Sequence, residues 1–110
     1  MSACQRAMQV AAFIAFAQVS AAFAQGPPPA GCPADLAAND ARFKETIARL
    51  DSVKNGTQAQ KCAAYRSHVQ VMRQALPIFQ RCTSGLAQSE NVGQMNDSIT
   101  DFEAVIKSRC

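Results

Sequence analysis

The sequence is poor in the residue types and motifs that usually carry catalysis. It has no tryptophan, one tyrosine and one histidine, and only 17% of its residues are charged. It contains no C-x-x-C or C-x-x-C-H motif, no HExxH motif and no glycine-rich phosphate loop. These absences argue against a thiol redox site, attached haem, a zinc protease site and a nucleotide-binding loop. We therefore expect a protein that is not an enzyme and holds no cofactor.

The charge balance is too mild to indicate a polyanionic partner. The formal net charge at pH 7 is +3, and it falls by one if Arg6 is removed with an N-terminal leader. Arg66 and Arg73 form a modest basic strip, but no aromatic side chains are interleaved with it for bases to stack on. We expect no nucleic-acid partner. A protein partner of unknown identity and the oligomeric state are left open.

Residues 1–24 have the three regions of a cleaved secretory signal peptide. Arg6 supplies a positive charge, an apolar run follows, and Ala22-Phe23-Ala24 places small residues at the cleavage point. Two glutamines interrupt the apolar run, which is too short for a stable transmembrane anchor. We expect cleavage between Ala24 and Gln25, no membrane span in the mature chain, and a periplasmic or secreted protein.

The mature chain is predicted to be one helical domain behind a short tether. Residues 25–32, QGPPPAGC, read as an extended tether, because this density of proline and glycine does not sustain a helix. Within residues 33–110, apolar residues recur at steps of three and four in three segments, and no segment alternates as a strand does. The predicted fold class is an all-α antiparallel three-helix bundle with two disulfides, preceded by a signal peptide.

The first two helices have clear start and stop residues. The first is predicted over Ala34–Lys54, behind Pro33 in its first turn, and Asn55-Gly56 is expected to supply left-handed conformations at its end. The second is predicted over Gln58–Cys82 and opens with Thr57 and Gln60 at capping-box spacing. Because few residues join them, the two helices should be antiparallel.

The second helix contains a proline, and the third helix has several possible caps. Pro77 is expected to kink the second helix without ending it, because the apolar stripe resumes beyond it. Residues 86–90 are predicted to be a short loop. The third helix is then expected to start at a cap formed by Ser89 or Asn91 and to end at Cys110.

Four cysteines remain after the leader, and the helix geometry selects one pairing among three. A helix of twenty residues spans about 30 Å, whereas a disulfide needs Cα atoms within about 7 Å. Cys62 and Cys82 therefore cannot pair, since they end the same helix. In an up-down-up bundle, the pairs that share an end are Cys32–Cys82 and Cys62–Cys110. A zinc site is disfavoured because the four sulfurs would have to meet at one point.

This register also predicts an ion pair between the second and third helices. If Cys62 faces Cys110, antiparallel counting places Glu103 between the levels of Arg66 and Arg73. We expect a flanking ion pair there, of about 0–1 kcal/mol because it would be exposed.

His68 is the one residue that suggests a metal. It lies one position off the apolar stripe, so the simplest expectation is a partly exposed helix-surface residue without a catalytic partner. His68 and Met72, at i and i+4, could offer nitrogen and sulfur to copper. An alternative function is therefore a periplasmic copper carrier that uses these two residues. The bundle is otherwise expected to be too small for a small-molecule pocket.

The segments CAAYRSHVQVM, FQRC, NVGQMNDSITDFEAVI and a final cysteine, behind a signal peptide, resemble small exported four-cysteine helical proteins of alphaproteobacteria. The resemblance implies an exported helical domain and implies no activity. Together with the absence of a catalytic motif, it favours a small, non-enzymatic binding or accessory protein of the cell envelope.

Overall fold

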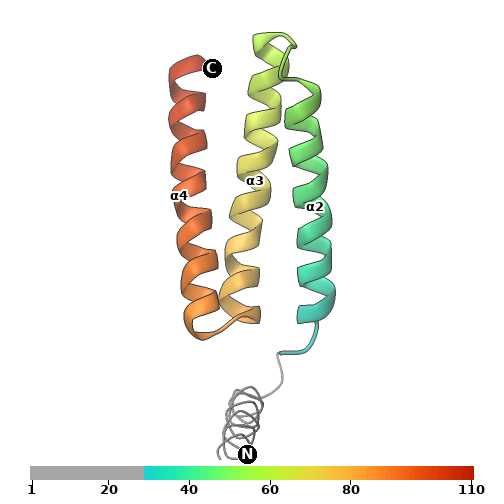
Figure 1. The fold of residues 1–110 in the computed structure, drawn as a ribbon, viewed down its shortest axis with the longest axis vertical. Coiled ribbons are helices and arrows are strands. Elements are labelled where there is room, and N and C mark those ends of the chain that lie inside the picture. Colours follow the sequence, from blue (N-terminus) through green and yellow to red (C-terminus); the bar gives the residue numbers. More distant parts are fainter. Residues whose placement is uncertain (1–28) are drawn as a thin grey trace, which may run out of the picture.

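The computed structural model describes residues 29–110, which form three long helices (Figure 1). Helix α2 spans Cys32–Ser52, α3 spans Gln58–Cys82 and α4 spans Gly85–Arg109. This part of the chain contains no strand. The predicted all-α three-helix bundle with two disulfides is thereby confirmed.

The expected leader lies outside the described residues. This holds for the signal peptide over residues 1–24, for the cleavage point between Ala24 and Gln25, and for the tether up to residue 28. Among the described helices, none combines the length and the hydrophobicity that a membrane crossing needs.

The starts of α2 and α3 follow from their local chemistry. Gly31 precedes α2 at φ 84°, and Pro33 follows in the first turn, where a missing N–H costs no helical hydrogen bond. The Thr57 hydroxyl accepts a hydrogen bond from the Gln60 N–H at 3.1 Å, and the Gln60 side chain accepts one from the Thr57 N–H at 2.9 Å. The predicted capping box at the start of α3 is confirmed.

The end of α2 differs from the prediction. The helix ends at Ser52, and the N–H of Val53 donates to the carbonyl of Arg49 at 3.1 Å. The N–H of Gly56 then donates to the carbonyl of Val53 at 2.8 Å. Neither Asn55 nor Gly56 has a positive φ, so the left-handed stop expected there was wrong. Consecutive hydrogen-bonded turns reverse the chain instead.

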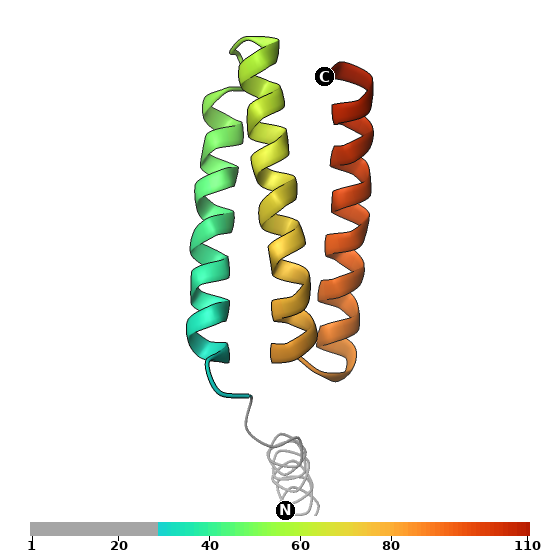
Figure 2. The same cartoon turned by 180° about the vertical axis from the view of Figure 1, so that it is seen from behind.

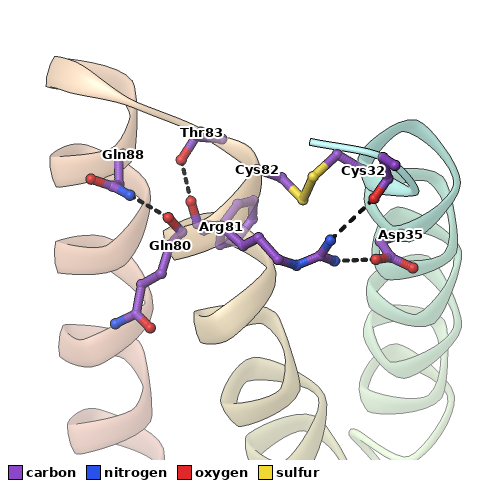
Figure 3. Close-up of a disulfide and its surroundings, with 9 residues drawn as sticks. Cys32, Asp35, Gln80, Arg81, Cys82, Thr83 and Gln88 are labelled. Atoms are coloured by element: carbon purple, nitrogen blue, oxygen red, sulfur yellow. Dashed lines mark hydrogen bonds and ion pairs between the residues drawn. A yellow bond between two sulfur atoms is a disulfide. The ribbon is translucent and has the colours of Figure 1, made fainter. Parts of the chain in front are cut away.

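The predicted loop over residues 86–90 was also wrong, because α4 already begins at Gly85. The N–H of Gln88 donates to the carbonyl of Ser84 at 3.3 Å, which closes the first turn. The side chain of Gln88 donates to the carbonyl of Gln80 at the end of α3 (Figure 3). Leucine, alanine and glutamine in this segment are good helix formers, and a two-residue link suffices to reverse the chain.

Helix α3 runs without interruption through Pro77 to Cys82, as predicted. The helix therefore tolerates the missing hydrogen bond to the carbonyl of Arg73. Pro77 is exposed, so its ring faces solvent and displaces no core side chain.

The three helices stand side by side in a row with α3 in the middle (Figure 1 and Figure 2). Helix α3 packs against both neighbours, whereas no Cα atom of α2 lies within 8 Å of a Cα atom of α4. The backbones of the two outer helices are therefore not in direct contact. Side chains rather than backbones must fill the space between the two outer helices.

The core forms along the middle of α3. Met72 is 1% exposed and packs with Val69 and Ile99 in a buried cluster. Partly buried side chains from all three helices surround this cluster: Phe43, Leu76, Met95, Phe102 and Ile106. The buried cluster thus consists of two residues of α3 and one of α4, and partly buried side chains of all three helices surround it.

Both disulfides have the predicted pairing. Cys32 at the start of α2 is bonded to Cys82 at the end of α3, with Cα atoms 5.4 Å apart (Figure 3). Cys62 near the start of α3 is bonded to Cys110 beyond α4, with Cα atoms 5.9 Å apart. Each disulfide joins one outer helix to the central helix, at opposite ends of the bundle. They close loops of similar length, with sequence separations of 50 and 48 residues.

Ion pairs reinforce the same two helix contacts. The guanidinium of Arg73 pairs with the carboxylate of Glu103, which confirms the predicted link between α3 and α4. The guanidinium of Arg81 pairs with Asp35 of α2 beside the Cys32–Cys82 disulfide (Figure 3). All four side chains are substantially exposed, so these pairs select the register more than they add stability.

Candidate functional site

His68 lies in the protein interior, so its expected place on the helix surface was wrong. Its exposed fraction is 8%, and its Nδ1 atom lies 2.8 Å from the hydroxyl oxygen of Thr46 on α2. The imidazole packs edge-on against Phe43 of α2 and Phe102 of α4, with ring centroids 5.9 and 5.0 Å away. A residue one position off the apolar stripe of α3 lies on the surface only if no second helix packs against that side of α3. Here α2 covers it.

Burial lowers the pKa of His68 below its ordinary value of 6.5, because the imidazolium would lose its hydration in the core. The ring is therefore neutral at neutral pH. As a neutral ring hydrogen-bonded to a hydroxyl, it satisfies the usual condition for a buried polar group.

Thr46 and His68 have the spacing of a nucleophile and its base, but not the surroundings. Thr46 is 9% exposed, and its hydroxyl donates its one proton to the carbonyl of Phe43 at 3.3 Å, so it accepts from the His68 ring. Aromatic rings flank His68 on both sides, where a catalytic histidine would need an orienting carboxylate and access to a substrate. The pair therefore links α2 to α3 inside the core.

The structure gives no support to copper binding by His68 and Met72. Both are buried, and Met72 lies in the centre of the core cluster. Residues 29–110 contain no group of three or more histidine, cysteine, aspartate or glutamate side chains that could hold a metal ion. A copper ion would have to displace packed core atoms to reach both ligands.

A surface pocket opens where the end of α2, the start of α3 and the end of α4 meet. We call it the basic-rimmed pocket. Its volume is about 430 Å³, within the usual range of about 300–1,000 Å³ for small-molecule sites. The pocket is a depression open to solvent, so it is not the enclosed pocket for which the bundle was expected to be too small. The lining residues come from all three helices: Leu50, Val53, Lys54, Lys61, Tyr65, Phe102 and Arg109.

The basic-rimmed pocket has an apolar floor and charges of one sign. Leu50, Val53, Tyr65 and Phe102 form the floor, and the rings of Tyr65 and Phe102 pack with centroids 6.0 Å apart. All charged side chains that line it are basic, and no carboxylate side chain is among them.

The three cations of the rim are not equally free. Lys54 pairs with Asp51 at 3.2 Å. Within residues 29–110, no carboxylate lies within ion-pair distance of Lys61 or Arg109. The pocket therefore presents two uncompensated cations next to an aromatic and aliphatic surface.

The backbone around the basic-rimmed pocket is held in place by two links. The Cys62–Cys110 disulfide joins α3 to the end of α4. The side chain of Gln58 donates to the carbonyl of Arg109 at 2.9 Å. Because both links are beside Lys61 and Arg109, the positions of these two residues relative to each other are set by the fold.

Two other surface depressions differ in their charge. A depression of about 260 Å³ between α2 and α3 is lined by Arg42, Arg49 and the acidic Glu45. Another of about 310 Å³ between α3 and α4 contains the paired Arg73 and Glu103. The second depression holds an ion pair, whereas the first has one carboxylate side chain beside two arginines and no ion pair between them. Among these three depressions, the basic-rimmed pocket is the one whose lining contains no carboxylate side chain, which favours an anion there.

The sequence pattern contained part of this site. Leu50, Val53, Tyr65 and Phe102 all belong to predicted apolar stripes, so they were expected to be core residues. They form a pocket floor because α2 and α4 do not close over α3. Only the positions of Lys61 and Arg109 beside the two ends of one predicted disulfide indicated that these cations would be neighbours.

No protein-family model, curated protein or solved structure matches this chain. The chemistry of the described residues therefore carries the functional assignment alone.

Proposed function

We propose that this protein is a small exported, non-enzymatic binding or accessory protein of the cell envelope, periplasmic or secreted. The observation that carries the proposal is the basic-rimmed pocket, in which uncompensated Lys61 and Arg109 adjoin an apolar floor. Apolar lining with a few converging polar groups is what ligand-binding sites share.

The disulfides support the export part of the proposal. Both cystines join separate helices and stabilise the fold rather than forming a reactive C-x-x-C pair. Structural disulfides form and persist in oxidising compartments and are rare in the cytosol. The two cystines thus agree with the leader predicted from residues 1–24.

The interior supports binding rather than catalysis. The one histidine of the chain is neutral, buried and hydrogen-bonded to Thr46. The carboxylates that are paired, such as Glu103 and Asp35, face arginines on the surface. Neither arrangement supplies a nucleophile with a base at an accessible position.

Capture of a partner from envelope extract tests the binding function. The full chain, carrying an affinity tag in the predicted tether, is expressed and recovered under non-reducing conditions. We expect a partner in stoichiometric amount with the wild type and its loss with the double variant Lys61→Gln/Arg109→Gln. The matched control, Lys44→Gln/Lys107→Gln, removes the same charge at exposed positions outside the pocket and should retain the partner.

Two results would contradict the proposal. One is the absence of both a stoichiometric partner and a bound small ligand; the other is equal capture by the pocket variant and the control. The export part is tested separately by cell fractionation with thiol labelling. Recovery in the cytosol with four free thiols would contradict it.

A further inference from the structure

We infer that the basic-rimmed pocket binds an organic anion with an apolar aromatic or alkyl body and a single carboxylate head. This inference rests on the proposed binding function and names the chemistry of its ligand. It follows from four properties of the pocket: its floor, its rim, its size and its rigidity.

The floor is suited to an apolar body. Tyr65 and Phe102 present tilted rings, with centroids 6.0 Å apart and an interplanar angle of 58°. Leu50 of α2 and Val53, directly after the end of α2, add aliphatic side chains to the lining. Covering this apolar area makes the free energy of binding more favourable, and the rings add edge and face contacts with an aromatic ligand.

The rim is suited to a carboxylate. Lys61 and Arg109 come from different helices and line the same pocket. An arginine can donate two parallel hydrogen bonds to a carboxylate, and a lysine adds a point charge. Within residues 29–110, no carboxylate forms an ion pair with Lys61 or Arg109. Both are therefore available to pair with the carboxylate of a ligand.

The size of the pocket favours a compact ligand over a polyanion. The volume is about 430 Å³, and the cations that line it are three, Lys54, Lys61 and Arg109. A nucleic acid or an anionic membrane surface would need cations spread over a long face. The acidic end of a partner protein would share the ligand chemistry, so the experiment must separate these two sources.

The backbone beside the pocket is crosslinked in the absence of a ligand. The Cys62–Cys110 disulfide and the hydrogen bond from Gln58 to the carbonyl of Arg109 fix the rim. The Phe102 ring packs against the imidazole of His68, with ring centroids 5.0 Å apart. Little ordering is then required when a ligand binds, which favours measurable affinity for a small molecule.

Titration with naphthoate and its uncharged amide, naphthamide, tests the inference. Both probes carry the same apolar body, and only naphthoate carries the head. We expect saturable NMR shifts at Lys61, Tyr65, Phe102 and Arg109 of the full oxidised chain. Naphthoate should bind about tenfold more tightly than naphthamide, as one or two charge-assisted hydrogen bonds would give.

Charge variants identify the rim as the cause. In Lys61→Gln/Arg109→Gln the preference for naphthoate should disappear, while naphthamide binding stays unchanged. The control Lys44→Gln/Lys107→Gln should keep the wild-type preference. Circular dichroism and a count of free thiols confirm that each variant is folded with both disulfides.

Three outcomes overturn the inference: no saturable shift in the pocket, equal affinity for the two probes, or an unchanged preference in the rim variant. Absence of naphthoate binding, combined with a protein captured from envelope through Lys61 and Arg109, would assign the pocket to an acidic protein segment. The binding function would then stand and the small-anion ligand would fall. Naphthoate binding without any captured partner would assign the binding function to a small anion and not to a protein segment.

Discussion

The Nδ1 atom of His68 and the hydroxyl oxygen of Thr46 lie 2.8 Å apart in the interior and join α3 to α2. Phe43 and Phe102 pack on the same imidazole, so one side chain contacts all three helices of the bundle. The position therefore reports on the whole fold. A change that protonates or removes this ring should lower the free energy of unfolding.

The bundle should lose stability in mild acid because of His68. Its folded pKa is lowered by burial, so the unfolded chain binds a proton first as the pH falls below about 6.5. The free energy of unfolding should therefore decrease from pH 6.5 down to the lower folded pKa, by up to about 1.4 kcal/mol per pH unit. Denaturant unfolding between pH 7 and pH 5 measures this slope.

The variant His68→Gln separates this effect from other titrations. Glutamine can keep a hydrogen bond to Thr46 but does not titrate, so the slope between pH 6.5 and pH 5 should flatten. An unchanged slope in this variant would show that another group causes the acid sensitivity. Carboxylates with ordinary pKa values titrate mainly below this window.

Removing the side chain of Asn39 should stabilise the protein. Asn39 is 3% exposed, and its Oδ1 atom has no hydrogen-bond partner among the described residues. Asn39→Ala removes this unsatisfied acceptor and improves helix propensity, so we expect a gain of about 1 kcal/mol. Thermal and denaturant unfolding measure the change.

A surface asparagine provides the matched control. Asn96→Ala, at an exposed position of α4, changes only helix propensity and should gain about 0.5 kcal/mol. If Asn39→Ala gains no more than Asn96→Ala, or destabilises the fold, the buried oxygen carries no penalty.

The two disulfides should be reduced in a fixed order. They close loops of similar length, so each should contribute a similar amount, about 4 kcal/mol in the chain-entropy model. Each cystine has one buried cysteine, Cys32 or Cys62, but the other partner differs in access, because Cys110 is exposed whereas Cys82 is half-buried. We expect limiting dithiothreitol to open Cys62–Cys110 first.

Alkylation followed by mass spectrometry gives the order directly. Early labelling of Cys32 and Cys82, or labelling of all four cysteines together, would contradict the prediction. The variants Cys62→Ser/Cys110→Ser and Cys32→Ser/Cys82→Ser should have similar losses of stability, which tests the loop-length argument separately.

The ion pair between Arg73 and Glu103 should have a small coupling energy. The two side chains are 62% and 44% exposed, so a double-mutant cycle with glutamine should give about 0.2–1 kcal/mol. High salt should reduce this value. A cycle of Arg66 with Glu103 is the control and should give no coupling, since Arg66 forms no ion pair in the described structure.

The helices and the cystine pairing were predictable because they depend on local pattern and on chain length. Apolar spacing gave the three helices, and the length of α3 excluded a bond between Cys62 and Cys82. The boundaries were less predictable. The end of α2 at Ser52 and the start of α4 at Gly85 depend on hydrogen bonds that form only when the chain has turned back.

The candidate site was less predictable than the fold. Lys61 and Arg109 are separated by most of two helices along the chain, and they share a pocket only because Cys62 is bonded to Cys110. The placement of His68 failed for a related reason. Periodicity gives the direction of a side chain around a helix axis, but not whether a neighbouring helix packs there.

The sequence by itself determined that this protein is three amphipathic helices joined by two cystines, since helical period and disulfide reach are properties of the chain. Tertiary structure alone decided that α2 and α4 pack on α3 without closing over it. That open arrangement depends on how side chains of three helices fill a shared volume. It buries His68 and leaves Tyr65 and Phe102 as the floor of a basic-rimmed pocket.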